Sequence, residues 1–230
     1  MLSLRSLHQY YGSSQTLRGL NLDIKRGSLT VLLGRNGVGK TTLLKSILGQ
    51  VNLRSGDMML DGKPIQDLPS HERVAAGLGY VPQGREIFPR LTVEENLLVG
   101  AAIRKSVSSV SEEIYALFPV LKQMKGRNGG DLSGGQQQQL AIGRALMSQP
   151  KLLILDEPTE GIQPNVIQMI GETLRKLVDT TGLTVLLVEQ YYDFAKQIAD
   201  DYAVMSRGEI IASGEGIHME RDGVEKLITV

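Results

Sequence analysis

The segment GRNGVGKTT at residues 34–42 constrains the fold of this chain more than any other stretch. It follows an apolar run at residues 28–33 that has the composition of a buried strand, and it leads into the helix-like sequence TTLLKSILG. Glycines let the backbone curl until successive N–H groups point at one anion, and the dipole of a helix that begins there attracts the same anion. The order strand, glycine-rich turn, helix predicts a phosphate-binding loop rather than an ordinary glycine turn.

Two polar side chains of this loop have defined roles. In a loop of this type the lysine reaches the β and γ phosphates of a nucleotide, and the hydroxyl that follows binds Mg²⁺. These roles fall to Lys40 and Thr41. The residues expected to hold the nucleotide are Gly34, Arg35, Asn36, Gly37, Val38, Gly39, Lys40, Thr41 and Thr42.

A second motif, LLILDE at residues 152–157, supplies two carboxylates. The apolar run predicts a buried parallel strand, and ligands of such sheets bind at the carboxyl ends of the strands. We expect Asp156 to bind Mg²⁺ and Glu157 to act as the general base, a role worth about 10² to 10⁴ in rate. The alternative for Glu157 is a cap of the turn before Pro158. These two motifs alone fit a kinase, a GTPase or an ATPase.

A third motif, LSGGQ at residues 132–136, opens a run of four glutamines. Ser133 and Gln136 have the spacing of a capping box, which predicts a helix that begins at Gly134. Gly134 and Gly135 carry no side chains over the first N–H groups, so this helix start is a second candidate anion site. A second anion site in the same chain disfavours a metabolic kinase.

The remaining pattern predicts an α/β fold. Apolar residues alternate at 20–24, and Asp61-Gly62 marks a hairpin, which together indicate an N-terminal antiparallel β layer. Thr92 and Glu95 form a capping box in a helical region. We expect one domain over residues 1–230. Its phosphate-loop ATPase core, with a parallel sheet, covers residues 1–83 and 150–230, and a helical subdomain is inserted at 84–149.

Composition excludes several classes of function. The chain has 25 basic and 25 acidic residues, so a nucleic-acid-binding surface is not expected. It has no cysteine and three histidines, which excludes disulfides and thiolate chemistry, argues against most zinc sites and fits a reducing compartment. The longest apolar runs are a few residues long, so we expect no membrane-spanning helix.

With these three motifs the chain resembles the nucleotide-binding subunits of ABC transporters, from residue 2 to about residue 214. The resemblance implies that two such subunits pair head to tail, so that the LSGGQ segment of one closes over ATP held by the other. It implies that Tyr11 stacks on adenine and that Gln83 contacts Mg²⁺ and the attacking water. The residues that would meet the ATP of the partner subunit are Ser133, Gly134, Gly135 and Gln136. Taken alone, a tyrosine at position 11, beside Tyr10, is more often an edge-strand aromatic than an adenine-stacking residue.

Two positions depart from the pattern of that family. Gln163 precedes Pro164 where an acidic residue is usual, and Gln190 stands where a histidine commonly contacts the γ phosphate. A glutamine donates hydrogen bonds but carries no charge. We therefore expect Gln190 to sense the γ phosphate by hydrogen bonding, with a changed ATPase rate in Gln190→Ala and no pH step from a histidine.

Three segments are similar to the urea-type ATPase subunit of the branched-chain amino acid and urea importers: HQYYG, QGREIFPRLTVEENLL and DLSGGQQQQLAIGRAL. The resemblance implies a bacterial importer of urea or short amides, with this subunit in the cytoplasm on the inner face of the plasma membrane. Its partners would be a second ATPase subunit, identical or a sister, two membrane permeases that dock around residues 84–100, and, indirectly, a periplasmic substrate-binding protein.

Two alternatives stay open at this point. The first is the ATPase of a branched-chain amino acid importer. The second is an ABC ATPase that acts on DNA or ribosomes without a membrane partner. The short insertion, the single ATPase cassette and the balanced charge argue against the second alternative.

Overall fold

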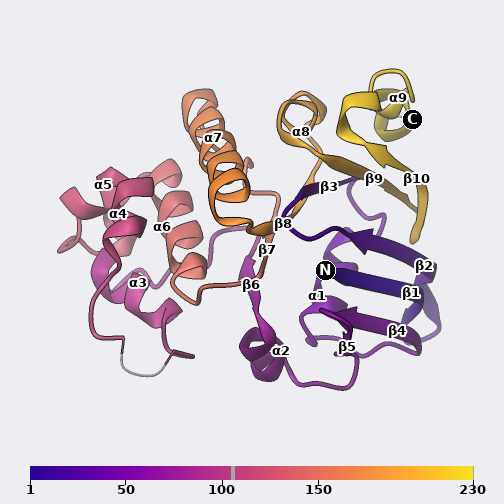
Figure 1. Ribbon diagram of the computed structural model, residues 1–230, viewed down its shortest axis with the longest axis horizontal. Coiled ribbons are helices and arrows are strands. Elements are labelled where there is room, and N and C mark those ends of the chain that lie inside the picture. Colours follow the sequence, from indigo (N-terminus) through magenta and orange to yellow (C-terminus); the bar gives the residue numbers. More distant parts are fainter. Residues whose placement is uncertain (105–106, 230) are drawn as a thin grey trace.

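Two β-sheets organise the chain (Figure 1). The computed structural model describes residues 1–104 and 107–229. Within these ranges one sheet has the strand order β2-β1-β4-β5 and the other the order β10-β9-β3-β8-β7-β6. The strands are β1 (Leu2–Tyr11), β2 (Ser14–Ile24), β3 (Leu29–Leu33), β4 (Ser55–Leu60), β5 (Lys63–Pro64), β6 (Leu78–Val81), β7 (Leu152–Asp156), β8 (Thr184–Glu189), β9 (Asp201–Ser206) and β10 (Glu209–Glu215).

The helices gather mainly on one side of the larger sheet. Helices α3 to α6 lie together at one end of the molecule, and the smaller sheet lies at the other end (Figure 1). The helices are α1 (Lys40–Ile47), α2 (Ser70–Ala76), α3 (Val93–Gly100), α4 (Glu112–Leu117), α5 (Pro119–Gln123), α6 (Gly134–Leu146), α7 (Pro164–Thr181), α8 (Tyr192–Ile198) and α9 (Val224–Thr229). In the described parts of the chain, none of them is both long and apolar enough to cross a bilayer.

The larger sheet is parallel except for its edge strand β10, which pairs antiparallel with β9. Both of its faces are buried. Leu153 and Leu155 of β7 pack into a core shared with α6 and α7, whereas Leu152 and Ile154 pack into a second core shared with α1 and the smaller sheet. Burial on both faces explains why this strand is continuously apolar.

The smaller sheet is antiparallel, as the sequence pattern predicts. Leu20, Leu22 and Ile24 of β2 face the core, and the residues between them are exposed. The hairpin between β4 and β5 turns at Asp61 and Gly62, whose φ angles of 51° and 74° are those that a type I′ turn requires.

Both predicted capping boxes are present. The Thr92 and Ser133 hydroxyls accept from the backbone N–H groups of Glu95 and Gln136, and each of these side chains accepts from the capping residue in return. The mixed α/β class with a parallel and an antiparallel sheet is therefore confirmed. The division of the chain into a core and a subdomain at residues 84 and 149 stays a prediction.

Candidate functional site

The glycine-rich loop runs from the carboxyl end of β3 to the start of α1. Gly34 has no room for a side chain, because an added Cβ would lie 2.6 Å from the carbonyl oxygen of Met205. Gly39 precedes α1 with a φ of 112°, a conformation that favours glycine. Lys40 is buried, and its ammonium donates to the carbonyl oxygens of Gly34 and Arg35 at 2.5 and 3.1 Å. The lysine thus folds back over its own loop.

Four neighbouring parallel strands each deliver one polar side chain to this place. The strand order β3-β8-β7-β6 sets side by side the chain segments that carry Lys40, Gln190, Glu157 and Gln83. These residues follow the carboxyl ends of their strands, where parallel sheets of this type bind ligands.

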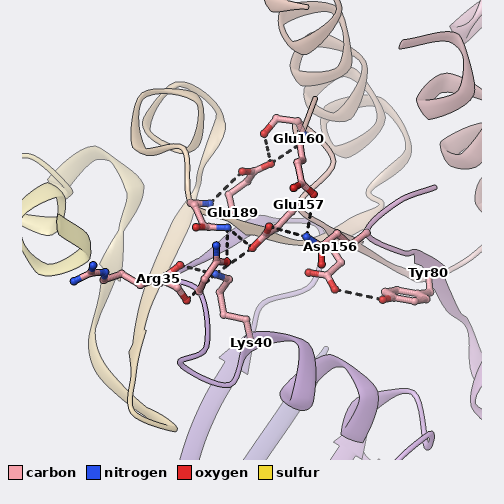
Figure 2. Close-up of polar contacts among 12 residues, drawn as sticks. Arg35, Lys40, Tyr80, Asp156, Glu157, Glu160 and Glu189 are labelled. Carbon is pink, nitrogen blue, oxygen red and sulfur yellow. Dashed lines mark hydrogen bonds and ion pairs between the residues drawn. The ribbon is translucent and has the colours of Figure 1, made fainter. Parts of the chain in front are cut away.

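Glu157 is the centre of this group (Figure 2). Its Oε1 atom lies 3.2 Å from the Lys40 ammonium and accepts a hydrogen bond of 2.7 Å from the Gln190 amide. Its Oε2 atom accepts from the Gln83 amide at 3.3 Å. Three side chains that the sequence predicts to contact the γ phosphate or the attacking water therefore bind one carboxylate.

Three of these residues, Lys40, Gln83 and Glu157, border a cavity of about 160 Å³. Gln190 also donates to Asn36 Oδ1 at 2.9 Å, and Gln83 donates to Glu160 at 2.9 Å, so both amides are held in place. The cavity is lined by Thr16, Arg35, Asn36, Gly37, Gly39, Lys40, Thr41, Thr42, Gln83 and Glu157. Most of the residues predicted to hold a nucleotide thus share one cavity.

Asp156 lies beside this cavity at the end of β7 and is 2% exposed. Its Oδ2 atom accepts a long hydrogen bond of 3.4 Å from the Tyr80 hydroxyl (Figure 2). Burial, and then the neighbouring charge of Glu157, raise the pKa of Asp156 to about 6, although Lys40 acts in the opposite direction.

The raised pKa of Asp156 predicts a pH-dependent stability. Between the ordinary pKa of 3.8 and about 6 the folded chain holds this proton more tightly than the unfolded chain, so the contribution of Asp156 to stability falls as the pH rises through that window. We expect the free energy of unfolding of Asp156→Asn to exceed that of the wild type by up to about 3 kcal/mol at about pH 8, so that the variant unfolds at a higher temperature. At about pH 4 this gain should be gone.

Thermal unfolding followed by circular dichroism at both pH values measures this difference. Asp57→Asn is the matched control, because Asp57 is exposed on β4. Equal unfolding temperatures for Asp156→Asn and the wild type at about pH 8 would contradict the raised pKa of Asp156.

The predicted second anion site lies at the start of α6. The two glycines at this helix start are closely packed against other segments. A Cβ added at Gly134 would lie 3.2 Å from the Arg85 guanidinium, and one added at Gly135 would lie 3.1 Å from the Val166 side chain. The glycines therefore serve close packing, which the sequence interpretation did not foresee. Within the described residues, none of Ser133, Gly134, Gly135 and Gln136 lines the cavity around Lys40.

The glutamine run is divided between surface and core. Gln138 and Gln139 are buried, and the Gln137 amide donates to the carbonyl oxygen of Gly129 at 3.3 Å. The run is thus a packed part of α6 and not a solvated low-complexity segment.

An arginine from α6 holds the loop that follows Gln83. Arg144 donates to the carbonyl oxygens of Arg85 and Glu86 at 3.1 and 2.8 Å, and these two residues have φ angles of 71° and 42°. Arg85 in turn donates to the Glu160 carbonyl oxygen at 3.1 Å. No local sequence signal indicated these contacts, which join residues 58 or more positions apart.

Tyr11 lies at the end of β1 opposite Ser14 and is half exposed. It does not line the cavity around Lys40, so its role against adenine stays a prediction. Sequence reasoning also missed Glu189, a buried carboxylate at the end of β8. A charged residue at the carboxyl end of an apolar strand is the signal that could have found it.

A glycine-rich loop between a parallel strand and a helix, with a buried lysine that meets a carboxylate from a neighbouring strand, defines a phosphate-loop nucleotide-binding protein. The sequence model of the ABC transporter family matches residues 17–160, which is more than half of the chain, and the chain therefore belongs to the ABC transporter family.

Similar proteins agree with this membership. The chain is 41% identical to the high-affinity branched-chain amino acid transport ATP-binding protein BraG of Pseudomonas aeruginosa, over 94% of this chain and 93% of that protein. It is 38% identical to the probable branched-chain amino acid transport ATP-binding protein LivF of Archaeoglobus fulgidus, over 99% and 98%.

Solved structures give the same fold. A nucleotide-free ATP-binding cassette from an ABC transporter superposes with a TM-score of 0.88 at 27% identity, over 100% of this chain and 97% of that one. A dimeric bacterial ABC transporter cassette has a TM-score of 0.84 at 27% identity, over 94% and 98%. The chain is thus an ATPase of the ABC type.

Proposed function

We propose that this chain is the ATP-hydrolysing subunit of an importer and that Glu157 is its general base. The observation that carries the proposal is the set of contacts at Glu157, whose carboxylate meets Lys40, Gln190 and Gln83 at 3.2, 2.7 and 3.3 Å. An ammonium and two amides that converge on a carboxylate equally suit a phosphoryl oxygen, because both are anions with lone pairs.

Exchange of one anion for the other links ATP binding to catalysis. When the γ phosphate enters, Lys40 and Gln190 bind its oxygens and release Glu157. The freed carboxylate then accepts a proton from the water whose oxygen attacks the γ phosphorus, and ADP leaves with the electrons of the broken P–O bond. Glu157 therefore becomes available as a base only when the substrate is bound.

The residues at the cavity also fit Mg²⁺. The Thr41 hydroxyl, the Gln83 amide oxygen and the Asp156 carboxylate would hold it. In the described residues there is no cluster of three or more histidine, cysteine or acidic side chains placed to bind a metal. One hydroxyl, one amide oxygen and one carboxylate suit an ion that keeps several waters and binds phosphate oxygens. Mg²⁺ would neutralise charge on those phosphates.

A second subunit is needed to complete the site. Ser133, Gly134, Gly135 and Gln136 lie outside the cavity around Lys40, so within one chain they do not reach a nucleotide held there. Two-fold, head-to-tail pairing would place this segment over the ATP of the partner, and either an identical chain or a sister subunit would serve. The dimeric cassette among the similar structures supports the pairing of two such chains.

Membrane permeases would dock on the helical region at residues 84–149, around residues 84–100. Phe88, Val99 and Ile103 expose large apolar side chains there, at 41% to 44% of their surface. Exposed large apolar side chains favour a protein interface. In this arrangement the chain would lie on the cytoplasmic face of the membrane, and a periplasmic binding protein would act through the permeases.

The transported solute belongs to the amino acid and urea group in this proposal. The printed names of the two relatives above support branched-chain amino acids. Urea or short amides, which the sequence resemblance favours, stay a prediction that none of these relatives supports specifically. Uptake of radiolabelled leucine and of urea by vesicles that contain the reconstituted complex separates the two.

Capture of the tagged chain from detergent-solubilised native membranes tests the importer role. We expect two permeases to accompany it. Recovery of ribosomes or DNA instead of permeases would reject the transport function in favour of an ABC ATPase that acts on nucleic acid.

A further inference from the structure

Glu189 lies at the carboxyl end of β8 and is 2% exposed. Its Oε1 atom accepts hydrogen bonds from the Thr159 hydroxyl at 2.9 Å and from the Thr159 backbone N–H at 3.3 Å. Its Oε2 atom accepts from the backbone N–H of Gln190 at 3.2 Å. Within the described residues no lysine, arginine or histidine forms an ion pair with it, so neutral donors alone satisfy this buried carboxylate.

The donors belong to the two segments that carry the proposed catalytic groups. Thr159 lies two residues after Glu157, and Gln190 follows Glu189 directly. Glu157 has a φ of 48°, which is uncommon for a residue with a side chain, and its N–H donates to the Val188 carbonyl oxygen at 2.9 Å. The end of β8 therefore holds the loop after β7 at two points, one through backbone and one through Glu189.

We propose that Glu189 is a positioning residue for ATP hydrolysis: it fixes the loop of Glu157 against the segment of Gln190 and so sets the contact between these two side chains. This inference rests on the roles given to Glu157 and Gln190 in the proposed function. The contact it sets is the 2.7 Å hydrogen bond from the Gln190 amide to Glu157.

The hydrogen bonds that Glu189 accepts from both segments require a carboxylate at this position. Both oxygens of Glu189 accept, whereas a glutamine has one accepting oxygen and an NH₂ group that donates. In Glu189→Gln the NH₂ group would meet either the Thr159 donors or the Gln190 N–H, so one side of the connection breaks while the side-chain volume stays the same.

Three variants of the full chain test the proposal by steady-state ATPase kinetics. Thr159→Val removes the hydroxyl donor at constant shape, Thr159→Ser keeps the hydroxyl, and Glu189→Gln alters the acceptor. We expect kcat to fall about tenfold to a hundredfold in Thr159→Val and Glu189→Gln, with KM for ATP changed by less than about threefold, because misplaced catalytic groups slow the chemical step. Thr159→Ser should restore most of kcat.

Controls separate positioning from stability. Thr180→Val is the matched control, since Thr180 is exposed on α7. The double variant Glu189→Gln with Thr159→Val should be no slower than the worse single variant, because both break one connection. A kcat within about twofold of the wild type in both folded single variants, or losses that multiply in the double variant, would overturn the proposal.

Hydrogen exchange gives a readout that does not depend on turnover. In Glu189→Gln at least one of the two amides, that of Thr159 or that of Gln190, should exchange about tenfold or more faster than in the wild type, while amides of β3 keep their rates. Unchanged exchange at both amides would also overturn the proposal. Full activity in Glu157→Gln would instead reject the proposed function itself, and so the two failures are distinguishable.

Discussion

Glu157→Gln is expected to lose ATP hydrolysis by about 10²- to 10⁴-fold while it binds ATP at least as tightly as the wild type. The loss follows because an amide does not accept the proton of the attacking water. Binding is kept or improved because Lys40 and Gln190, which bind the carboxylate at 3.2 and 2.7 Å, no longer have to exchange a charged partner for the γ phosphate. Phosphate release and the binding of a labelled ATP analogue measure the two effects.

The control for this variant is Glu172→Gln, because Glu172 is exposed on α7. It should hydrolyse ATP at the rate of the wild type. Undiminished turnover in Glu157→Gln would remove Glu157 from the role of base, and weaker ATP binding would contradict its competition with the γ phosphate.

Lys40→Ala is expected to weaken ATP binding by about 2 to 5 kcal/mol, which corresponds to a factor between about 30 and several thousand. Lys40 is 5% exposed, and its removal takes away the cation that meets Glu157. The γ phosphate would then approach an unpaired carboxylate in a site with little water, where like charges repel strongly. Titration of the chain with ATP in a calorimeter measures the loss.

Two further variants sharpen this test. Lys45→Ala is the matched control, because Lys45 is exposed on the same helix, α1. The double variant Lys40→Ala with Glu157→Gln should recover part of the lost affinity, since it removes the repulsion as well as the attraction. An affinity of Lys40→Ala within about threefold of the wild type would show that the lysine does not contact the triphosphate.

Most of the secondary structure followed from local sequence. Both capping boxes, the hairpin at Asp61-Gly62 and the buried strand at residues 152–156 occur where the pattern predicts them. Each depends on residues within a few positions of one another, so a short window of sequence contains the physical cause. The glycine-rich loop was predictable in the same way, because its glycines and Lys40 lie within one short segment of the chain.

Contacts between distant segments were not predictable in this way. Arg144 holds the loop at Arg85 and Glu86, and Glu189 binds Thr159 across 30 positions. Such contacts require the strand order of the sheet, which apolar periodicity does not encode, because every buried parallel strand has a similar composition.

The sequence by itself determined the kinds of chemical groups in this protein: an anion-binding loop, two carboxylates at the end of one strand and a capped helix with a glycine start. Only the tertiary structure decided which groups meet. The order β3-β8-β7-β6 gathers Lys40, Gln190, Glu157 and Gln83 at one edge of the sheet. The glycine start of α6 lies outside that group and does not line the cavity around Lys40. Helix α6 lies with α3, α4 and α5 at the end of the molecule away from the smaller sheet (Figure 1).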